Sequence, residues 1–169
     1  SYVQAEAAAS ESDHGDVGSY NDIGVQISPE MVEGLTLGYA FGEVTEPNAN
    51  DQHSTTNDES TLWMNYAYGP ITVGYQTSDV DGQTTTQDDE SSAMSIVYAI
   101  SDNISVSYGT HELDLGSSTT DQESSAMAAS YTMGGMSITV QQTTIDNVAG
   151  STAAANDIEG YDLNVAFAF

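Results

Sequence analysis

The chain has 169 residues, no Lys or Arg, and 26 Asp and Glu residues, which give a formal net charge of −26 at pH 7. Without cationic side chains it cannot neutralise nucleic-acid phosphates, and it cannot bind anionic lipid through a basic patch. The chain has no Cys, which excludes disulfides and thiol chemistry. It also has no run of about 20 apolar residues, the length that a transmembrane helix requires.

Hydrophobic and polar residues alternate along the chain, beginning with Ile23, Val25 and Ile27. Because side chains on a β-strand point to opposite faces at a period of two, this alternation predicts strands with one apolar face and one polar face. Residues that favour tight turns separate successive strands, as at Gly69-Pro70. The pattern predicts about ten strands, near residues 2–9, 20–28, 35–44, 60–68, 71–78, 91–100, 104–113, 124–132, 136–145 and 160–169.

Long polar connections alternate with these tight turns, at residues 10–19, 46–59, 80–90, 114–123 and 146–158. An up-and-down barrel places its short turns at one end and its long loops at the other, whereas a Greek-key sandwich does not sort its connections in this way. A weak repeat (58–64, 89–94 and 122–127) holds two strands per unit, which favours repeated hairpins over four-stranded propeller blades. The predicted fold class is therefore all-β, an antiparallel up-and-down transmembrane β-barrel that forms a single unit over residues 1–169.

The two faces of this barrel have different predicted roles. Small and hydrogen-bonding residues are expected to line a hydrated pore: Thr72, Gly74, Gln76, Ser105, Ser107, Thr139, Gln141, Asp162 and Asn164. Rings near the short turns are expected to form an aromatic girdle at the membrane boundary: Tyr66, Tyr68, Tyr98, Tyr131, Phe167 and Phe169. Tyr39, Tyr75 and Tyr108 are expected to serve the opposite boundary. A soluble β-sandwich is the alternative, since its solvent-exposed face would carry similar polar residues.

Few residues carry a pattern of metal or catalytic chemistry. Carboxylates at Asp79, Asp81, Asp88, Asp89 and Glu90 have part of the spacing of a calcium loop, but the glycine is misplaced and strands flank the segment. A solvated loop is the favoured interpretation, with weak Ca²⁺ binding as the alternative. No motif requires a cofactor, and loosely bound Ca²⁺ is the one candidate. No nucleophile elbow, phosphate loop or metalloprotease motif is present, so no enzymatic activity is expected.

Residues 90–109 and 123–133, and the ending Leu163-Asn-Val-Ala-Phe-Ala-Phe169, resemble the general-diffusion porins of alphaproteobacteria, the Rhodobacter type. The resemblance covers most of the chain from about residue 20, and it implies that these strands form the C-terminal part of a 16-stranded, trimeric barrel in the outer membrane. The terminal Phe is similar to the signal that the outer-membrane assembly machinery reads in that family. The family's constriction loop would lie before Ser1, and its basic cluster has no counterpart here, so no constriction residues are carried over.

The expected function is passive diffusion of small hydrophilic solutes and ions across an outer membrane, with cations favoured by the acidic loops. Ten strands cut from a larger barrel leave two open edges, which cannot face lipid. Three outcomes follow: further strands complete the wall, the ten strands close alone, or copies pair edge to edge as a fibre. The first is favoured. A secreted acidic β-rich fibre and a calcium-dependent surface adhesin are the alternative functions.

Overall fold

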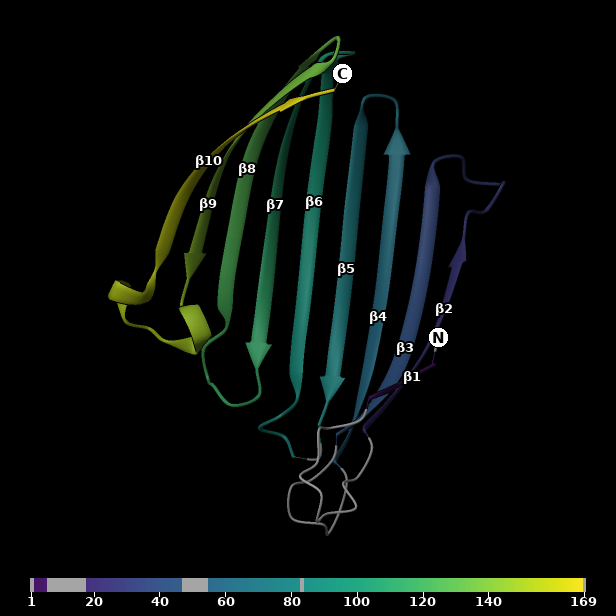
Figure 1. Ribbon diagram of the computed structural model, residues 1–169, viewed down its shortest axis with the longest axis vertical. Helices are drawn as coiled ribbons and strands as arrows, with labels where there is room; N and C mark the ends of the chain where they lie inside the picture. Colours follow the sequence, from purple (N-terminus) through teal and green to yellow (C-terminus); the bar gives the residue numbers. More distant parts are fainter. Residues whose placement is uncertain (1, 6–17, 47–54, 83, 169) are drawn as a thin grey trace.

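A computed structural model describes residues 2–5, 18–46, 55–82 and 84–168. These residues form one antiparallel sheet, in which every strand pairs with its neighbours along the chain (Figure 1). The strands are β1 (Tyr2–Ala5), β2 (Gly18–Ile27), β3 (Leu35–Glu46), β4 (Thr55–Tyr68), β5 (Ile71–Asp81), β6 (Asp89–Ser101), β7 (Ile104–Leu115), β8 (Gln122–Met133), β9 (Met136–Asp146) and β10 (Ile158–Phe167). Two short 3₁₀ turns, η1 (Val148–Gly150) and η2 (Ala154–Asn156), lie between β9 and β10.

The predicted antiparallel up-and-down topology is confirmed, and so is the sorting of the connections. Short turns join β2 to β3, β4 to β5, β6 to β7 and β8 to β9 at the upper end in Figure 1, and the described residues of the connections from β5 to β6, β7 to β8 and β9 to β10 lie at the lower end. Gly69 and Gly134 adopt φ values of 56° and 58°, a conformation that glycine adopts at little cost. The two-residue turns at these positions therefore follow from the glycines that the sequence places there.

Most strands extend further toward the long connections than the alternation predicted. The expected connection 46–59 is strand from Thr55 onward, and 80–90, 114–123 and 146–158 each lose residues to the strands on either side. Apart from Val80, Leu115 and Ile158, these added residues are polar or charged, so the backbone pairs although no hydrophobic period marks it. The first expected strand, 2–9, is observed only as Tyr2–Ala5, and its remaining residues lie outside those that the structure describes.

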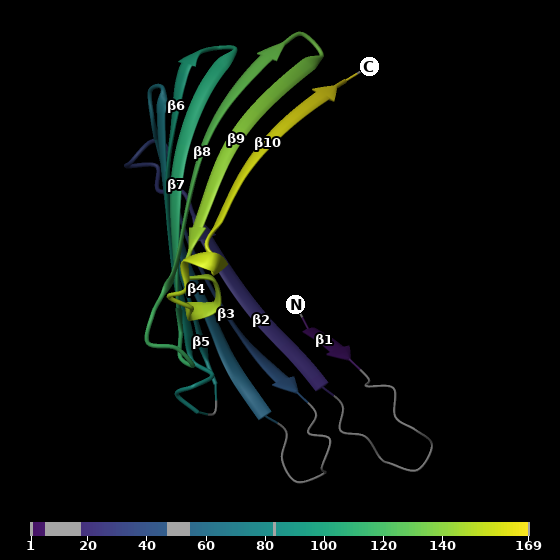
Figure 2. The ribbon, with the colours of Figure 1, turned by 90° about the vertical axis from the view of Figure 1, so that its left-hand side faces the viewer.

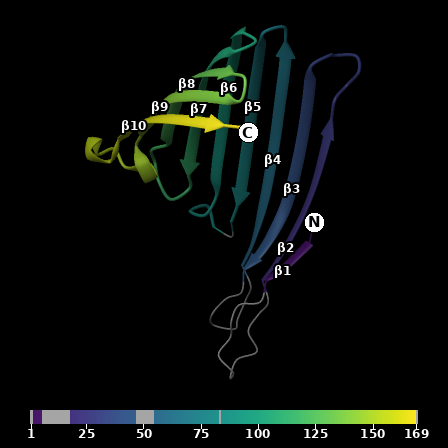
Figure 3. The ribbon, with the colours of Figure 1, turned by 45° about the horizontal axis from the view of Figure 1, so that its top comes forward.

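The sheet is a single curved layer. Figures 2 and 3 show it bent so that the strands at its two edges, β1 and β10, lie on the same side. Among the described residues, β1 pairs only with β2 and β10 only with β9, so the described sheet is open. None of the helices in the described residues is long and apolar enough to cross a bilayer.

No hydrophobic core exists in the described part of the chain: no hydrophobic side chain there is buried. The chain exposes 11757 Å², whereas a compact monomer of 17.8 kDa would expose about 8,000 Å². A soluble sandwich would bury one face of this sheet against a second sheet. The described residues contain no second sheet, so the sandwich alternative is wrong for this chain by itself.

Candidate functional site: two faces of one sheet

Strand register divides the side chains into two sets, which we call the apolar face and the polar face. Cross-strand partners in an antiparallel pair project to the same side, so each face can be followed from strand to strand. The apolar face holds Leu62, Met64 and Tyr66 of β4 with their partners, and the polar face holds Trp63 and Asn65 of β4 with theirs.

The apolar face collects most of the exposed hydrophobic side chains. Among the described residues, 28 large hydrophobic side chains are exposed, Tyr68 at 74% and Phe167 at 60%. All but four of them lie on the apolar face; Met31 and Val32 are in the β2–β3 connection, and Val97 and Ile158 are on the polar face. A continuous apolar surface of this extent requires a covering medium or partner.

Five of the six predicted girdle residues share the apolar face, and Phe169 lies outside the described residues. The cross-strand row of Tyr66 reaches β6 at Ile96, and Tyr98 lies two residues further toward the short turns. The same step of two residues for every two strands leads from Tyr98 to Tyr131 and then to Phe167. The four rings on β4, β6, β8 and β10 therefore lie on one straight line, and the rings of Tyr66 and Tyr68 stack with centroids 6.5 Å apart.

The boundary between apolar and polar residues on this face also crosses the strands obliquely. Leu62 is the last apolar residue of β4 toward the long connections, and Val140 is the last on β9. The row of cross-strand partners that contains Val140 runs through Ala129, Val106, Tyr98, Ile71 and Tyr68. The boundary thus shifts from residue 62 to residue 68 of β4 over the steps from β4 to β9. With a rise of about 3.3 Å per residue and strands about 4.8 Å apart, this shift corresponds to a strand tilt of about 40°. Measured instead from Phe41 on β3, which pairs with Ser60, to Tyr161 on β10, which lies in the row of Tyr66, the same boundary gives about 30°.

Carboxylates occupy the apolar face only beyond this boundary, toward the long connections. There they stand directly opposite one another across the strands, in the sets Glu43–Asp58–Asp81, Asp79–Glu90–Asp114 and Glu112–Glu123–Asp146. No Lys or Arg exists to separate them, and like charges directly opposite destabilise a sheet. We call these residues the acidic collar.

The five carboxylates predicted to bind Ca²⁺ do not share one face of the sheet. Asp79, Asp81 and Glu90 belong to the acidic collar, whereas Asp89 projects from the polar face and its Oδ1 accepts a hydrogen bond from the Gly116 N–H at 3.2 Å. The Oδ1 of Asp88, in the β5–β6 connection, accepts the Gly82 N–H at 2.9 Å. Among the described residues, no three acidic or histidine side chains gather closely enough to hold a metal ion. The five carboxylates therefore do not converge, and the weak Ca²⁺ site has no support from this arrangement.

All nine predicted pore-lining residues lie on the polar face: Thr72, Gly74, Gln76, Ser105, Ser107, Thr139, Gln141, Asp162 and Asn164. Several of the hydroxyls on this face bond to one another across strands, as between Thr61 and Ser78 at 2.9 Å and between Ser105 and Ser130 at 2.7 Å. From β5 to β9 the strand residues on this face include one carboxylate, Asp89. Over β5 to β9 the polar face is therefore hydrogen-bonding but nearly uncharged.

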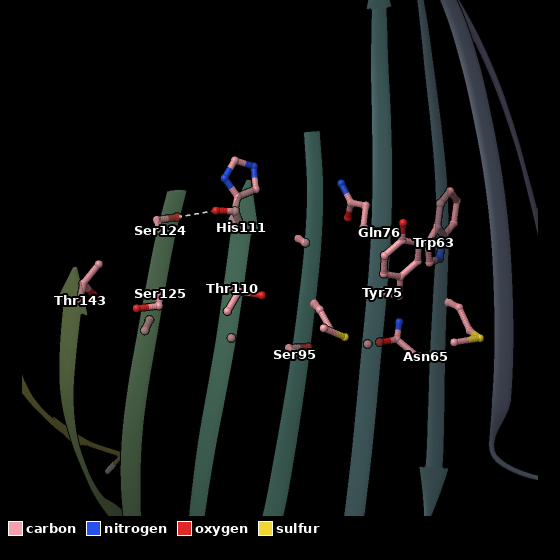
Figure 4. Close-up of a pocket in the computed structure, with 16 residues that line it drawn as sticks. Trp63, Asn65, Tyr75, Gln76, Ser95, Thr110, His111, Ser124, Ser125 and Thr143 are labelled. Carbon is pink, nitrogen blue, oxygen red and sulfur yellow. Dashed lines mark hydrogen bonds between the residues drawn. The ribbon is translucent and has the colours of Figure 1, made fainter. Parts of the chain in front are cut away.

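A hollow of about 370 Å³ opens on this face across β4 to β9 (Figure 4). Its floor is made of small residues: Gly74, Ala93, Ser95, Gly109 and Ala126. Taller side chains surround the floor: Trp63, Asn65, Gln76, His111, Ser124 and Thr143. Of these residues, only Gln76 beside the floor and Gly74 in the floor belong to the pore-lining set predicted from the sequence. Trp63, Asn65 and His111 could not be selected, because the hollow forms from residues that the register brings together from separate hairpins.

No protein-family model, curated protein or solved structure matches the chain. The resemblance to alphaproteobacterial porins consequently stays a hypothesis from the sequence, and the assignment of function depends on the two faces.

Proposed function

We propose that this sheet forms part of the wall of an outer-membrane β-barrel through which small hydrophilic solutes and ions diffuse passively. The observation that carries the proposal is the apolar face, which is exposed, continuous over β2 to β10 and bounded by an oblique line. The opposite face is polar and hollowed, as the water-filled side of such a wall would be.

The oblique boundary favours a bilayer over other coverings. Strands of membrane barrels tilt by about 35–45° from the membrane normal, and a boundary set by a flat layer of hydrocarbon crosses such strands obliquely. The tilt of about 30–40° obtained from the register overlaps this range. A second protein sheet would impose no such straight limit on where carboxylates begin. Strands of 10 to 14 residues, from β2 to β10, are also long enough, since about 9–11 tilted residues span a bilayer.

Closure of the wall is part of the proposal. Open strand edges carry unpaired backbone groups, which cannot face hydrocarbon, and the described sheet has an edge at β1 and another at β10. We propose that further strands, outside these 169 residues, complete a larger barrel, and that the barrels assemble as trimers in the outer membrane, as the resemblance implies. Outer-membrane lipid is then the partner of the apolar face.

The carboxylates are expected to make the channel favour cations, although its wall is nearly uncharged. The acidic collar and the described acidic residues of the connections from β5 to β6 and from β7 to β8 lie at one end of the sheet, where their negative potential raises the local concentration of cations. The wall between β5 and β9 stays nearly neutral. Cations are therefore expected to be favoured at the entrance, while uncharged solutes meet little resistance from the wall.

Reconstitution of the protein together with the strands that complete its barrel tests this function. We expect the protein to need detergent or lipid to stay dispersed, to migrate differently on gels before and after heating, and to produce current steps in planar bilayers. A protein that stays monomeric in plain buffer would contradict the proposal and favour the adhesin. Sedimenting filaments that form without detergent and give no current would favour the edge-paired fibre instead.

A further inference from the structure

We propose that the hollow on the polar face is a weak binding site for neutral polyhydroxylated solutes, such as mono- and disaccharides, with the Trp63 indole as its stacking surface. This inference rests on the proposed function in one respect: the solute reaches the hollow from the water-filled side of the wall. The residues of the hollow carry the assignment of the ligand class.

Trp63 is fixed against the wall. Its cross-strand partner is Gly38, a buried glycine on β3, and a Cβ built on Gly38 would collide with the six-membered ring of Trp63. The indole therefore lies over the Gly38 backbone and borders the hollow (Figure 4). An aromatic surface held in this way suits the C–H face of a sugar ring, which needs flat apolar contact beside hydrogen-bonding groups.

Hydrogen-bonding groups border the same floor. Trp63 and Gln76 lie in one cross-strand row with His111 and Ser124, and Ala93 leaves a gap between Gln76 and His111. The next row contributes Asn65 at one side and small residues along the floor. Indole and amide N–H groups, amide oxygens, an imidazole and hydroxyls together can donate to and accept from sugar hydroxyls.

These groups are largely unused by the protein. Among the residues drawn in Figure 4, one hydrogen bond made by a side chain is present, from the Ser124 hydroxyl to the backbone oxygen of His111 at 3.4 Å. In the described part of the chain, the Trp63 indole N–H, the Asn65 amide and the His111 ring bond to no other residue. A pocket of about 370 Å³ with a few free polar groups and one aromatic surface is within the size range of small-molecule sites.

The charges decide against other ligands. No Lys or Arg exists to hold an anion, and no carboxylate lines the hollow to hold a cation, although the chain carries 26 of them. The hollow therefore has neither a cationic nor an anionic side chain, and this lining suits a neutral ligand. A solute that must also leave the channel is expected to bind weakly, so that occupancy slows passage without stopping it.

Trp63 provides a direct probe, because it is the one tryptophan of the chain. The full chain in detergent is titrated with maltose while Trp63 emission is recorded, and the same protein in planar bilayers is titrated while ion current is recorded. A polyethylene glycol of equal hydrodynamic size controls for simple obstruction, and choline chloride controls for cation binding. We expect saturable changes in emission and current with maltose alone.

Variants locate the site. Trp63→Leu is expected to weaken the current block by about 2- to 10-fold, the range for loss of one aromatic contact. Gly109→Val fills the floor, where a Cβ meets its nearest neighbour, the Met94 carbonyl oxygen, at 3.4 Å, and should abolish the saturable emission change. Gly24→Val is the matched control, since it also lies on the polar face, its Cβ meets Ala40 at 3.5 Å, and it is remote from the hollow.

Each outcome separates the two proposals. Saturable block that is lost in Trp63→Leu and Gly109→Val but kept in Gly24→Val supports the sugar site. Current steps with no saturable response to maltose, or the same response in every variant, overturn the sugar site and leave the channel intact. A saturable response to choline but not to maltose overturns the neutral-ligand assignment. Absence of current steps overturns the channel, while the emission titration still decides whether the hollow binds sugar.

Discussion

The two faces of this sheet are built from the same strands, yet they place adjacent residues in chemically different surroundings. Ile96 and Val97 of β6 are neighbours in sequence and are both aliphatic and exposed, at 44% and 37%. Ile96 stands among rings and aliphatics on the apolar face, and Val97 stands among Thr72 and Ser107 on the polar face. The comparison teaches that exposure alone does not identify the solvent, because the neighbours on each face indicate hydrocarbon on one side and water on the other.

Placing a lysine on each face should give the largest difference in the free energy of unfolding between the two faces. If the apolar face meets hydrocarbon, Ile96→Lys lowers the free energy of unfolding in vesicles by about 2–4 kcal/mol, because an ammonium group near the midplane loses its hydration. Val97→Lys, on the water-filled side, should cost less than about 1 kcal/mol. Urea titration in lipid measures both values. Equal costs for the two variants would mean that both faces meet the same medium.

Glycine substitution sharpens the description of the polar face. Gly38→Ala places a methyl group against the Trp63 ring, and displacement of that ring is expected to cost about 1–3 kcal/mol, the range for overpacking. Trp63 emission should shift at the same time. Gly24→Ala, whose Cβ would make ordinary contact with Ala40, should leave stability and emission nearly unchanged. Unchanged emission in Gly38→Ala would show that Trp63 does not lie over the Gly38 backbone.

A smaller effect is expected in the acidic collar. Glu90 stands between Asp79 and Asp114 on neighbouring strands, so Glu90→Gln should raise the free energy of unfolding by about 0.2–1 kcal/mol at low ionic strength, through relief of like-charge repulsion. Added salt should reduce the gain, because ions screen exposed charges. Glu33→Gln, an exposed change in the β2–β3 connection, should give no gain. A gain for Glu90→Gln that is independent of salt would point to packing instead of charge.

The smallest effect concerns ion preference. Neutralising Asp88, Asp89 and Glu90 together should lower cation over anion permeability by no more than about twofold, since most of the 26 carboxylates remain. Reversal potentials in planar bilayers under a salt gradient measure the ratio. Glu30→Gln with Glu33→Gln, at the short-turn end, serves as the control. An unchanged reversal potential in the triple variant would show that these carboxylates do not contribute to ion selection.

The strands and their order were predictable because each strand carries its own signal. Leu62, Met64, Tyr66 and Tyr68 alternate with polar or small residues almost throughout, and Gly69 marks the turn that follows. The ends of the strands near the long connections were not predictable in the same way. At Asp58 and Glu59, for example, both faces are polar, so backbone pairing continues without a change in hydrophobicity that could mark it.

The hollow lay beyond sequence reasoning for a different reason. Gly74, Ser95 and Gly109 are unremarkable as single small residues on three strands. They become a floor only when the register sets them side by side between Asn65 and Thr143. Register depends on turn geometry and on the pairing of whole strands. It therefore cannot be predicted from the residue pattern of each strand taken separately. Trp63 was not predicted as a site residue for the same reason, because the position of its ring depends on the pairing with Gly38 of the neighbouring strand.

Cysteine accessibility tests the contact between the apolar face and lipid most directly, because the chain has no Cys of its own and every introduced thiol is unique. Single variants at Met64, Ile96, Val106 and Val140 are paired with variants at Asn65, Val97, Ser107 and Gln141, the next residue on each strand. In vesicles, a water-soluble thiol reagent should label the second set rapidly and the first set only after unfolding. Rapid labelling of both sets, or protection of the first set in lipid-free buffer, would contradict a lipid-facing wall.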